Sequence, residues 1–198
     1  GMFATSFPVR CFASITKTQE VNDVAVAPGD VASVERGDVI TYRLGVRTAG
    51  SIGLDRVTLS DVIPAGTEYV AGSMQVRDET RNLPAGGYAT LTDAADAVEP
   101  SLPPGTGGTG AFVGGSAVFR LGDGANATVG GALGASANGV CAVGRTCQMS
   151  VSFRVRVTDA AAAGDLIQNR AELRYRPLGQ VGLPAALVET SPTVTALV

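Results

Sequence analysis

Three polar residues occupy positions at which the strand periodicity of this chain predicts apolar ones. Lys17, Asp61 and Asn169 each share the parity of the apolar residues two places away in their own run. Alternate side chains of a strand point to the same face, so all three are predicted to point into the core. An unpaired polar group in a core is costly, and these residues therefore need either partners or a chemical role.

A buried lysine, a carboxamide and a carboxylic acid are the groups required to form an amide crosslink. Burial lowers the pKa of a lysine and raises the pKa of an aspartic acid, which favours a neutral nucleophile and a protonated acid. Lys17, the only lysine among 15 basic residues, would attack the carboxamide carbon of Asn169 and release ammonia. Asp61 would polarise the carbonyl and shuttle the protons. Lys17, Asn169 and Asp61 are thus candidates for an autocatalytic isopeptide crosslink.

A non-covalent alternative accounts for the same residues. Asp61 would accept hydrogen bonds from the turn before Pro64, and Asn169 would bridge two strands. Lys17 would extend its ammonium group past the edge of the sheet into water. The sequence leaves both alternatives open.

The absence of histidine argues against an enzyme. It removes the commonest general base and the commonest zinc ligand, so no Ser-His-Asp or Cys-His nucleophile can be built from this chain. A pair of carboxylates remains chemically possible among 18 Asp and Glu, but no particular pair stands out. We expect no catalytic turnover, no cofactor and no metal.

The chain has three cysteines. Cys141 and Cys147 flank a short loop between two predicted strands, and an exported protein could close this loop with a disulfide. Free buried thiols are the alternative. Cys11, near the start of the chain, is predicted either to be unpaired or to reach a partner that the sequence does not identify.

Alternating apolar and polar residues predict strands along most of the chain. The pattern is clearest within Gly37–Ser73, where two alternating runs are separated by a glycine-rich break and end at Pro64. A strand-turn-strand order with almost no helical pattern predicts an all-β fold, an antiparallel two-sheet sandwich of the immunoglobulin-like type, with a closed barrel as second choice. We expect one elaborated domain over residues 1–198, with a Gly/Pro-rich, loop-rich insertion at about 78–115.

Several segments resemble the repeat domain known as the domain of unknown function 11 family. The most specific is Ser60-Asp-Val-Ile-Pro-Ala-Gly66, and further matches lie at Ala13–Thr18, Val118–Gly122, Val151–Val157 and Leu166–Glu172. The resemblance implies an immunoglobulin-like repeat domain of bacterial or archaeal envelope proteins, and it implies no reaction. Bacterial pilin and adhesin domains of this kind are similar in carrying a lysine on an early strand and an asparagine on the last.

These observations favour a non-enzymatic structural or adhesion-type module of a secreted or cell-surface protein, with the periplasm as a further possible location. The expected partners are other envelope or surface proteins, or neighbouring domains of the same polypeptide. A net charge of −3 argues against nucleic acid. No apolar run approaches the roughly 20 residues of a membrane helix, so no membrane insertion is expected. The alternative function is binding of a protein or glycan through the 78–115 region.

Overall fold

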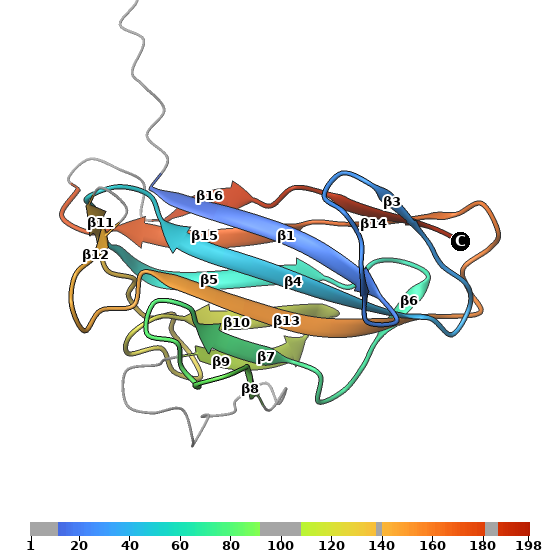
Figure 1. Ribbon diagram of the computed structural model, residues 1–198, viewed down its shortest axis with the longest axis horizontal. Coiled ribbons are helices and arrows are strands. Elements are labelled where there is room, and N and C mark those ends of the chain that lie inside the picture. The colour runs from blue at the N-terminus through green and yellow to red at the C-terminus, as the bar shows by residue number, and fades with distance from the viewer. Residues whose placement is uncertain (1–11, 92–107, 138–139, 181–185) are drawn as a thin grey trace, which may run out of the picture.

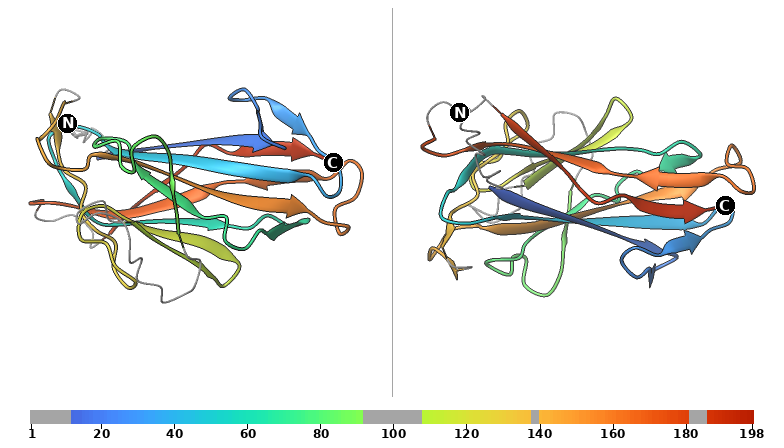
Figure 2. Two further views of the ribbon diagram at one scale, coloured as in Figure 1. Left: turned by 60° about the horizontal axis from the view of Figure 1, so that its bottom comes forward. Right: turned by 90° about the horizontal axis from the view of Figure 1, so that it is seen from above.

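The regular elements of the protein are strands, which form two large sheets packed face to face (Figures 1 and 2). The computed structural model describes residues 12–91, 108–137, 140–180 and 186–198. Within these ranges there is no α-helix. The all-β prediction and the predicted antiparallel two-sheet sandwich are confirmed.

The first sheet is seven-stranded and antiparallel. Its long central strands have apolar residues at every second position, and this alternation turns one face of each strand toward the other sheet. In spatial order the strands are β2 (Val24–Ala25), β1 (Ala13–Val21), β4 (Val39–Thr48), β13 (Gln148–Val157), β7 (Gln75–Asp78) and β8 (Ala89–Thr90), and β6 (Thr67–Tyr69) also pairs with β13.

The second sheet is five-stranded and covers the inner face of the first (Figure 2). Its order is β16 (Leu187–Thr190), β15 (Ala171–Pro177), β5 (Leu54–Val62), β10 (Ser116–Leu121) and β9 (Gly108–Val113). Two small sheets complete the described structure. One pairs β11 (Ser136–Ala137) with β12 (Val140–Cys141), and the other has the order β14 (Leu166–Asn169), β17 (Val194–Leu197) and β3 (Val31–Ser33).

The two large sheets share one hydrophobic core. Tyr42, Phe119 and Phe153 are fully buried at its centre, with ring centroids 5.4 Å apart for Tyr42 and Phe153 and 6.3 Å for Phe119 and Phe153. Tyr42 lies opposite Phe153 in the antiparallel register of β4 and β13. This aromatic layer lies directly beside the lysine predicted to point inward.

The predicted insertion holds more regular structure than its composition suggested. The loop-rich insertion was predicted at about 78–115, but within it the chain forms β9, which begins at Gly108. Gly110 is needed within this strand, since a Cβ there would lie 2.9 Å from the Met74 sulfur and 3.0 Å from Leu91 Cδ1. Close packing against the core therefore explains one of the glycines that had indicated a loop. Residues 92–107 of the expected insertion lie outside the described residues.

Apolar and polar residues alternate without a break from Ile167 to Arg176, but the structure divides this run into two strands at Arg170. Residues before the break pair with β17, where Asn169 lies opposite Val194, and residues after it pair with β5, where Ala171 lies opposite Asp61. The break places Asn169 at the point where the chain passes from the small sheet into the large one.

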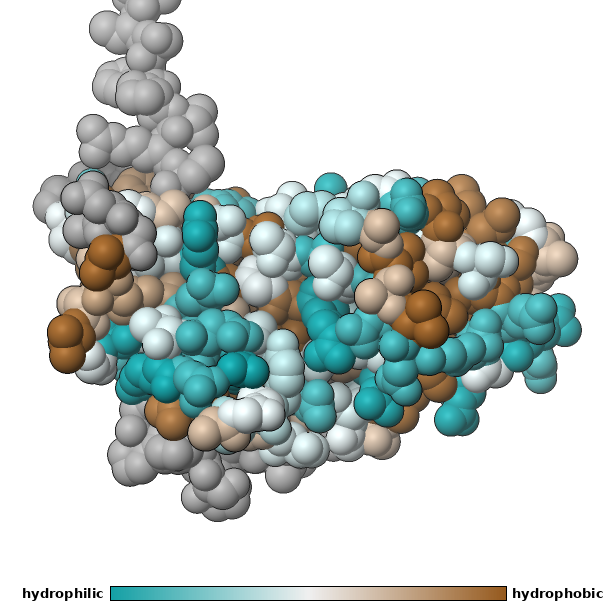
Figure 3. Space-filling model, viewed as in Figure 1, coloured by the Kyte–Doolittle hydropathy of each residue, from teal (hydrophilic) through white to brown (hydrophobic). Residues whose placement is uncertain are grey.

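On the face shown in Figure 3, polar and apolar side chains are interspersed, and a group of apolar side chains lies over the end of the molecule that carries β3. Exposed apolar residues in this part of the chain include Val24 and Val31. The described residues include no helix long and apolar enough to cross a bilayer.

Candidate functional site

The structure brings Lys17, Asp61 and Asn169 together in the interior. Lys17 comes from β1 in the first sheet, Asp61 from β5 in the second, and Asn169 from the end of β14. The Lys17 ammonium nitrogen donates to Asp61 Oδ2, and both side chains are fully removed from solvent. Asn169 is 3% exposed, and its amide lies near enough to the Asp61 carboxyl group to oppose, together with Lys17, the rise in the Asp61 pKa that burial causes. Asp61 is 44 positions from Lys17 and 108 positions from Asn169 in the sequence, yet the three residues share one dry site.

Strand register explains this meeting. Asp61 lies directly opposite Ala171. Asn169 and Ala171 are both buried while Arg170 between them is exposed, so the Asn169 side chain points into the interior on the side where Ala171 and Asp61 lie. Lys17 lies opposite Leu44 on the inner face of the first sheet. Because stacked sheets lie roughly 10 Å apart, a long lysine side chain from one sheet can reach short polar side chains on the other.

Tyr42 on β4 is a fourth member of the site, which the sequence analysis missed. The Lys17 nitrogen lies 4.6 Å from the centroid of the Tyr42 ring and 5.9 Å from that of Phe153. Burial raises the pKa of the Tyr42 hydroxyl, and the Asn169 amide lies near enough to oppose that rise. In the sequence Tyr42 is one inward residue of an alternating run, and its only distinguishing signal is a hydroxyl group in an otherwise aliphatic series.

Burial sets the protonation states of the site. Desolvation lowers the pKa of Lys17, and the charge and hydrogen bond of Asp61 oppose this shift. Desolvation also raises the pKa of Asp61, against the opposing effects of Lys17 and Asn169. The two directions together favour an uncharged amine beside an uncharged carboxylic acid. Burial, and then the nearby Asp61 charge, raise the pKa of Tyr42, so its hydroxyl stays protonated.

Unsatisfied polar atoms gather at this site. Asp61 Oδ1, the Tyr42 hydroxyl oxygen and Asn169 Nδ2 are buried, and none has a hydrogen bond of ordinary geometry within the described part of the chain. Buried polar atoms nearly always find partners, and three exceptions in one place call for an explanation. One of the three, Asn169 Nδ2, is the atom that departs as ammonia if Lys17 and Asn169 react.

The non-covalent alternative fits the structure less well. It required the Lys17 side chain to reach water, but that side chain is 0% exposed. It also required hydrogen bonds from Asn169 across two strands, and its amide nitrogen has none among the described residues. The structure shows instead a buried Lys17–Asp61 pair, and such a pair contributes little net stability because desolvation offsets its attraction.

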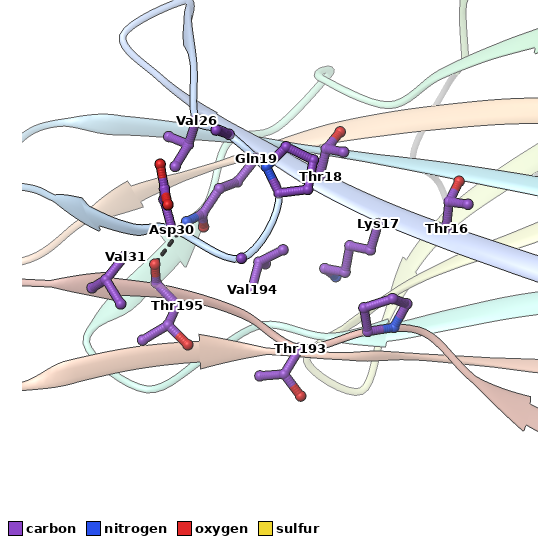
Figure 4. Close-up of a pocket in the computed structure, with 14 residues that line it drawn as sticks. Thr16, Lys17, Thr18, Gln19, Val26, Asp30, Val31, Thr193, Val194 and Thr195 are labelled. Carbon is purple, nitrogen blue, oxygen red and sulfur yellow. Dashed lines mark hydrogen bonds between the residues drawn. The ribbon is translucent and has the colours of Figure 1, made fainter.

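A groove of about 310 Å³ runs along the outer edge of β1 beside the site (Figure 4). Its walls come from β1, from the segment between β2 and β3, and from residues 192–195. Figure 4 shows Gln19 reaching across to Thr195, where its Nε2 donates to the Thr195 carbonyl over 2.7 Å. This bond links the first long strand to the last strand of the chain, next to the buried lysine.

A second polar cluster anchors the cysteine loop. A disulfide joins Cys141 and Cys147 in the structure. Next to it, the Thr146 hydroxyl donates to Asp78 Oδ2 over 2.7 Å and to Asp123 Oδ1 over 3.1 Å, and Arg81 forms ion pairs with both carboxylates. Across the described residues no group of three or more His, Cys, Asp or Glu is placed to hold a metal ion. Cys11 lies outside the described residues.

Reduction of the Cys141–Cys147 disulfide is expected to lower the free energy of unfolding by about 2 kcal/mol, because a cross-link that closes a short loop removes little entropy from the unfolded chain. Urea unfolding with and without a reductant, in a Cys11→Ser background that prevents thiol exchange, measures this difference. A thiol titration that finds both Cys141 and Cys147 free in the unreduced protein would contradict the prediction.

Comparison with solved structures shows the fold class. The chain resembles the major pilin subunit of Bacillus cereus (TM-score 0.53, 12% identity, 93% of this chain and 40% of that chain) and the backbone pilin of Streptococcus pyogenes (TM-score 0.55, 14% identity, 92% and 36%). It also resembles the collagen-binding subdomain of the Enterococcus faecalis surface protein ACE (TM-score 0.50, 13% identity, 95% and 97%). The fold is therefore an immunoglobulin-like β-sandwich of the type found in pilins and adhesins.

The same comparisons limit what the likeness says. The chain spans well under half the length of the two pilins. Neither a family model nor a curated protein sequence matches it. The resemblance to the domain of unknown function 11 family thus stays a prediction, while the broader likeness to immunoglobulin-like surface domains is established for the fold.

Proposed function

We propose that this protein is a non-enzymatic structural or adhesion-type module of a secreted or cell-surface bacterial protein, stiffened by an isopeptide bond between Lys17 and Asn169. The observation that carries the proposal is the burial of Lys17, Asp61 and Asn169 in one dry site between the sheets. A fold shared with pilin and adhesin domains supports the mechanical role.

The proposed reaction exchanges one amide for another. The neutral Lys17 amine attacks Cγ of Asn169, while the protonated Asp61 hydrogen-bonds to the carboxamide oxygen as it gains negative charge. The new Nζ–Cγ bond forms and the Cγ–Nδ2 bond breaks. One amine proton passes through the Asp61 carboxyl group to Nδ2, which leaves as ammonia. Asp61 ends the reaction protonated as it began, so atoms and charge balance without any cofactor.

The position of the bond suits a load-bearing role. Lys17 lies in the first long strand, and Asn169 is the last residue of β14, in the last third of the chain. A covalent link between them encloses most of the strands of both large sheets. Tension applied at the two ends would pass from residue 17 to residue 169 through the link, and the enclosed strands would carry none of it.

Force spectroscopy tests this function. When the protein is pulled from its ends, only the 45 residues outside the link (1–16 and 170–198) are expected to extend, which gives roughly 150 Å at about 3.3 Å per residue. An Asn169→Ala variant, which cannot form the link, should instead extend over its whole length, by roughly 650 Å. Equal long extensions for both proteins would contradict the proposed role.

Location and partners belong to the same proposal. A chain with a disulfide fits an oxidising compartment. A crosslink that resists tension suits an extracellular or cell-surface location, where a protein is exposed to pulling forces. The partners would be neighbouring domains of the same polypeptide or other surface proteins. Binding of a protein or glycan through the 78–115 region remains a prediction, since residues 92–107 lie outside the described structure.

A further inference from the structure

We infer that Tyr42 aligns the two reacting groups, with its ring supporting the Lys17 amine and its hydroxyl holding the Asn169 carboxamide. The inference rests on the proposed crosslink and adds to it a residue that acts on the rate of the reaction. Tyr42 is fully buried on β4, between β1, which carries Lys17, and β13, which carries Phe153.

Tyr42 lies beside both groups that would be joined. Its ring centroid lies 4.6 Å from the Lys17 nitrogen. Its hydroxyl oxygen and Asn169 Nδ2 are both buried without a hydrogen bond among the described residues, and burial raises the pKa of the hydroxyl while the nearby Asn169 amide opposes that rise. Phe153 also lies near the Lys17 nitrogen, at 5.9 Å, but it has no polar atom to offer the carboxamide. The tyrosine hydroxyl is therefore the feature that distinguishes the two rings.

The need for alignment follows from the shape of a carboxamide. Its carbon accepts a nucleophile only from above or below the amide plane, and Asn169 can rotate about its Cβ–Cγ bond. The Asp61 carboxyl group, whose pKa is raised by burial against the effects of Lys17 and of the nearby amide, would hold the carboxamide at one point and leave it free to rotate there. A second contact from Tyr42 fixes the plane, so that Cγ faces Lys17. Orientation alone changes reaction rates by orders of magnitude. Removal of the Tyr42 hydroxyl oxygen should therefore slow formation of the Lys17–Asn169 bond.

Timed cell-free synthesis of the full chain tests the role of Tyr42. Samples are quenched in acidic denaturant at successive times, and their intact masses are measured by mass spectrometry. The change in mass with time gives the rate of ammonia loss after synthesis. Tyr42→Phe is expected to slow this loss by about 10- to 100-fold while reaching the same final product. Tyr175→Phe, which removes the hydroxyl of another buried tyrosine that donates to Glu189, should leave the rate unchanged.

A stability measurement separates alignment from simple damage to the fold. In an Asn169→Ala background, where no bond can form, the unfolding free energies with and without Tyr42→Phe should agree closely. Unchanged kinetics in Tyr42→Phe would overturn the inference alone. A rate loss matched by a proportionate loss of stability would assign Tyr42 a structural role and would also overturn it. A wild-type chain that never loses ammonia would overturn both the crosslink and the role of Tyr42.

Discussion

An Asn169→Ala variant is expected to keep the full mass of its sequence and to unfold at a temperature about 10–20 °C lower than the wild-type protein. A link that closes a loop of more than about 100 residues stabilises a fold by roughly 5 kcal/mol through the entropy of the unfolded chain, and each kcal/mol moves the midpoint of a domain of this size by about 2–4 °C. Calorimetry of the two proteins, together with their intact masses, measures both effects.

Gln168→Ala provides the matched control for this variant. Gln168 precedes Asn169 in the same strand, but its side chain points outward and is exposed. Its removal should change neither the mass nor the midpoint beyond the small effect of a surface substitution. If Asn169→Ala and Gln168→Ala shift the midpoint equally, Asn169 has only an ordinary structural role.

Asp61→Ala is expected to be the most damaging single substitution at the site. It removes the acid that the reaction needs, so the bond does not form, and it leaves an unreacted Lys17 buried without its partner. Loss of one member of a buried pair typically costs about 3–5 kcal/mol, and this adds to the stabilisation lost with the crosslink. Urea unfolding should show a large loss of stability, and the intact mass should equal that of the variant sequence with no ammonia lost.

Two further variants make this result interpretable. Asp61→Asn keeps the shape of the side chain but cannot transfer a proton, so it should block ammonia loss at a smaller cost in stability and remain measurable if Asp61→Ala does not fold. Asp55→Ala, on the same strand, removes a partly exposed ion pair with Arg176, and such pairs contribute less than about 1 kcal/mol. Ammonia loss in Asp61→Asn would show that Asp61 is not the proton carrier.

The alternation of residues along each strand predicted the three central residues of the site, because this alternation is a local property of the sequence. The alternation around Lys17, Asp61 and Asn169 indicates the inward face without knowledge of the partner strands. The structure shows all three buried, with Lys17 and Asp61 in direct contact. The ends of β5, Leu54–Val62, were also predicted, because a glycine-rich break and a proline bound that run.

Features that depend on long-range packing were not predicted. Tyr42 belongs to the site because β4 lies beside β1, a pairing that no local pattern reveals. The β9 strand was missed because its glycines resemble those of a loop, although Gly110 is required by the approach of Met74 and Leu91. The break at Arg170 was missed because the alternation continues through it, while the pairing partner changes from β17 to β5.

The central claim is a covalent bond, and the intact mass of the reduced wild-type protein tests it most directly. The account predicts a mass one ammonia lighter than the sequence, and digestion should yield a branched peptide that joins the segment containing Lys17 to the segment containing Asn169. A mass equal to that of the unmodified sequence, with Lys17 recovered in a linear peptide, would contradict it.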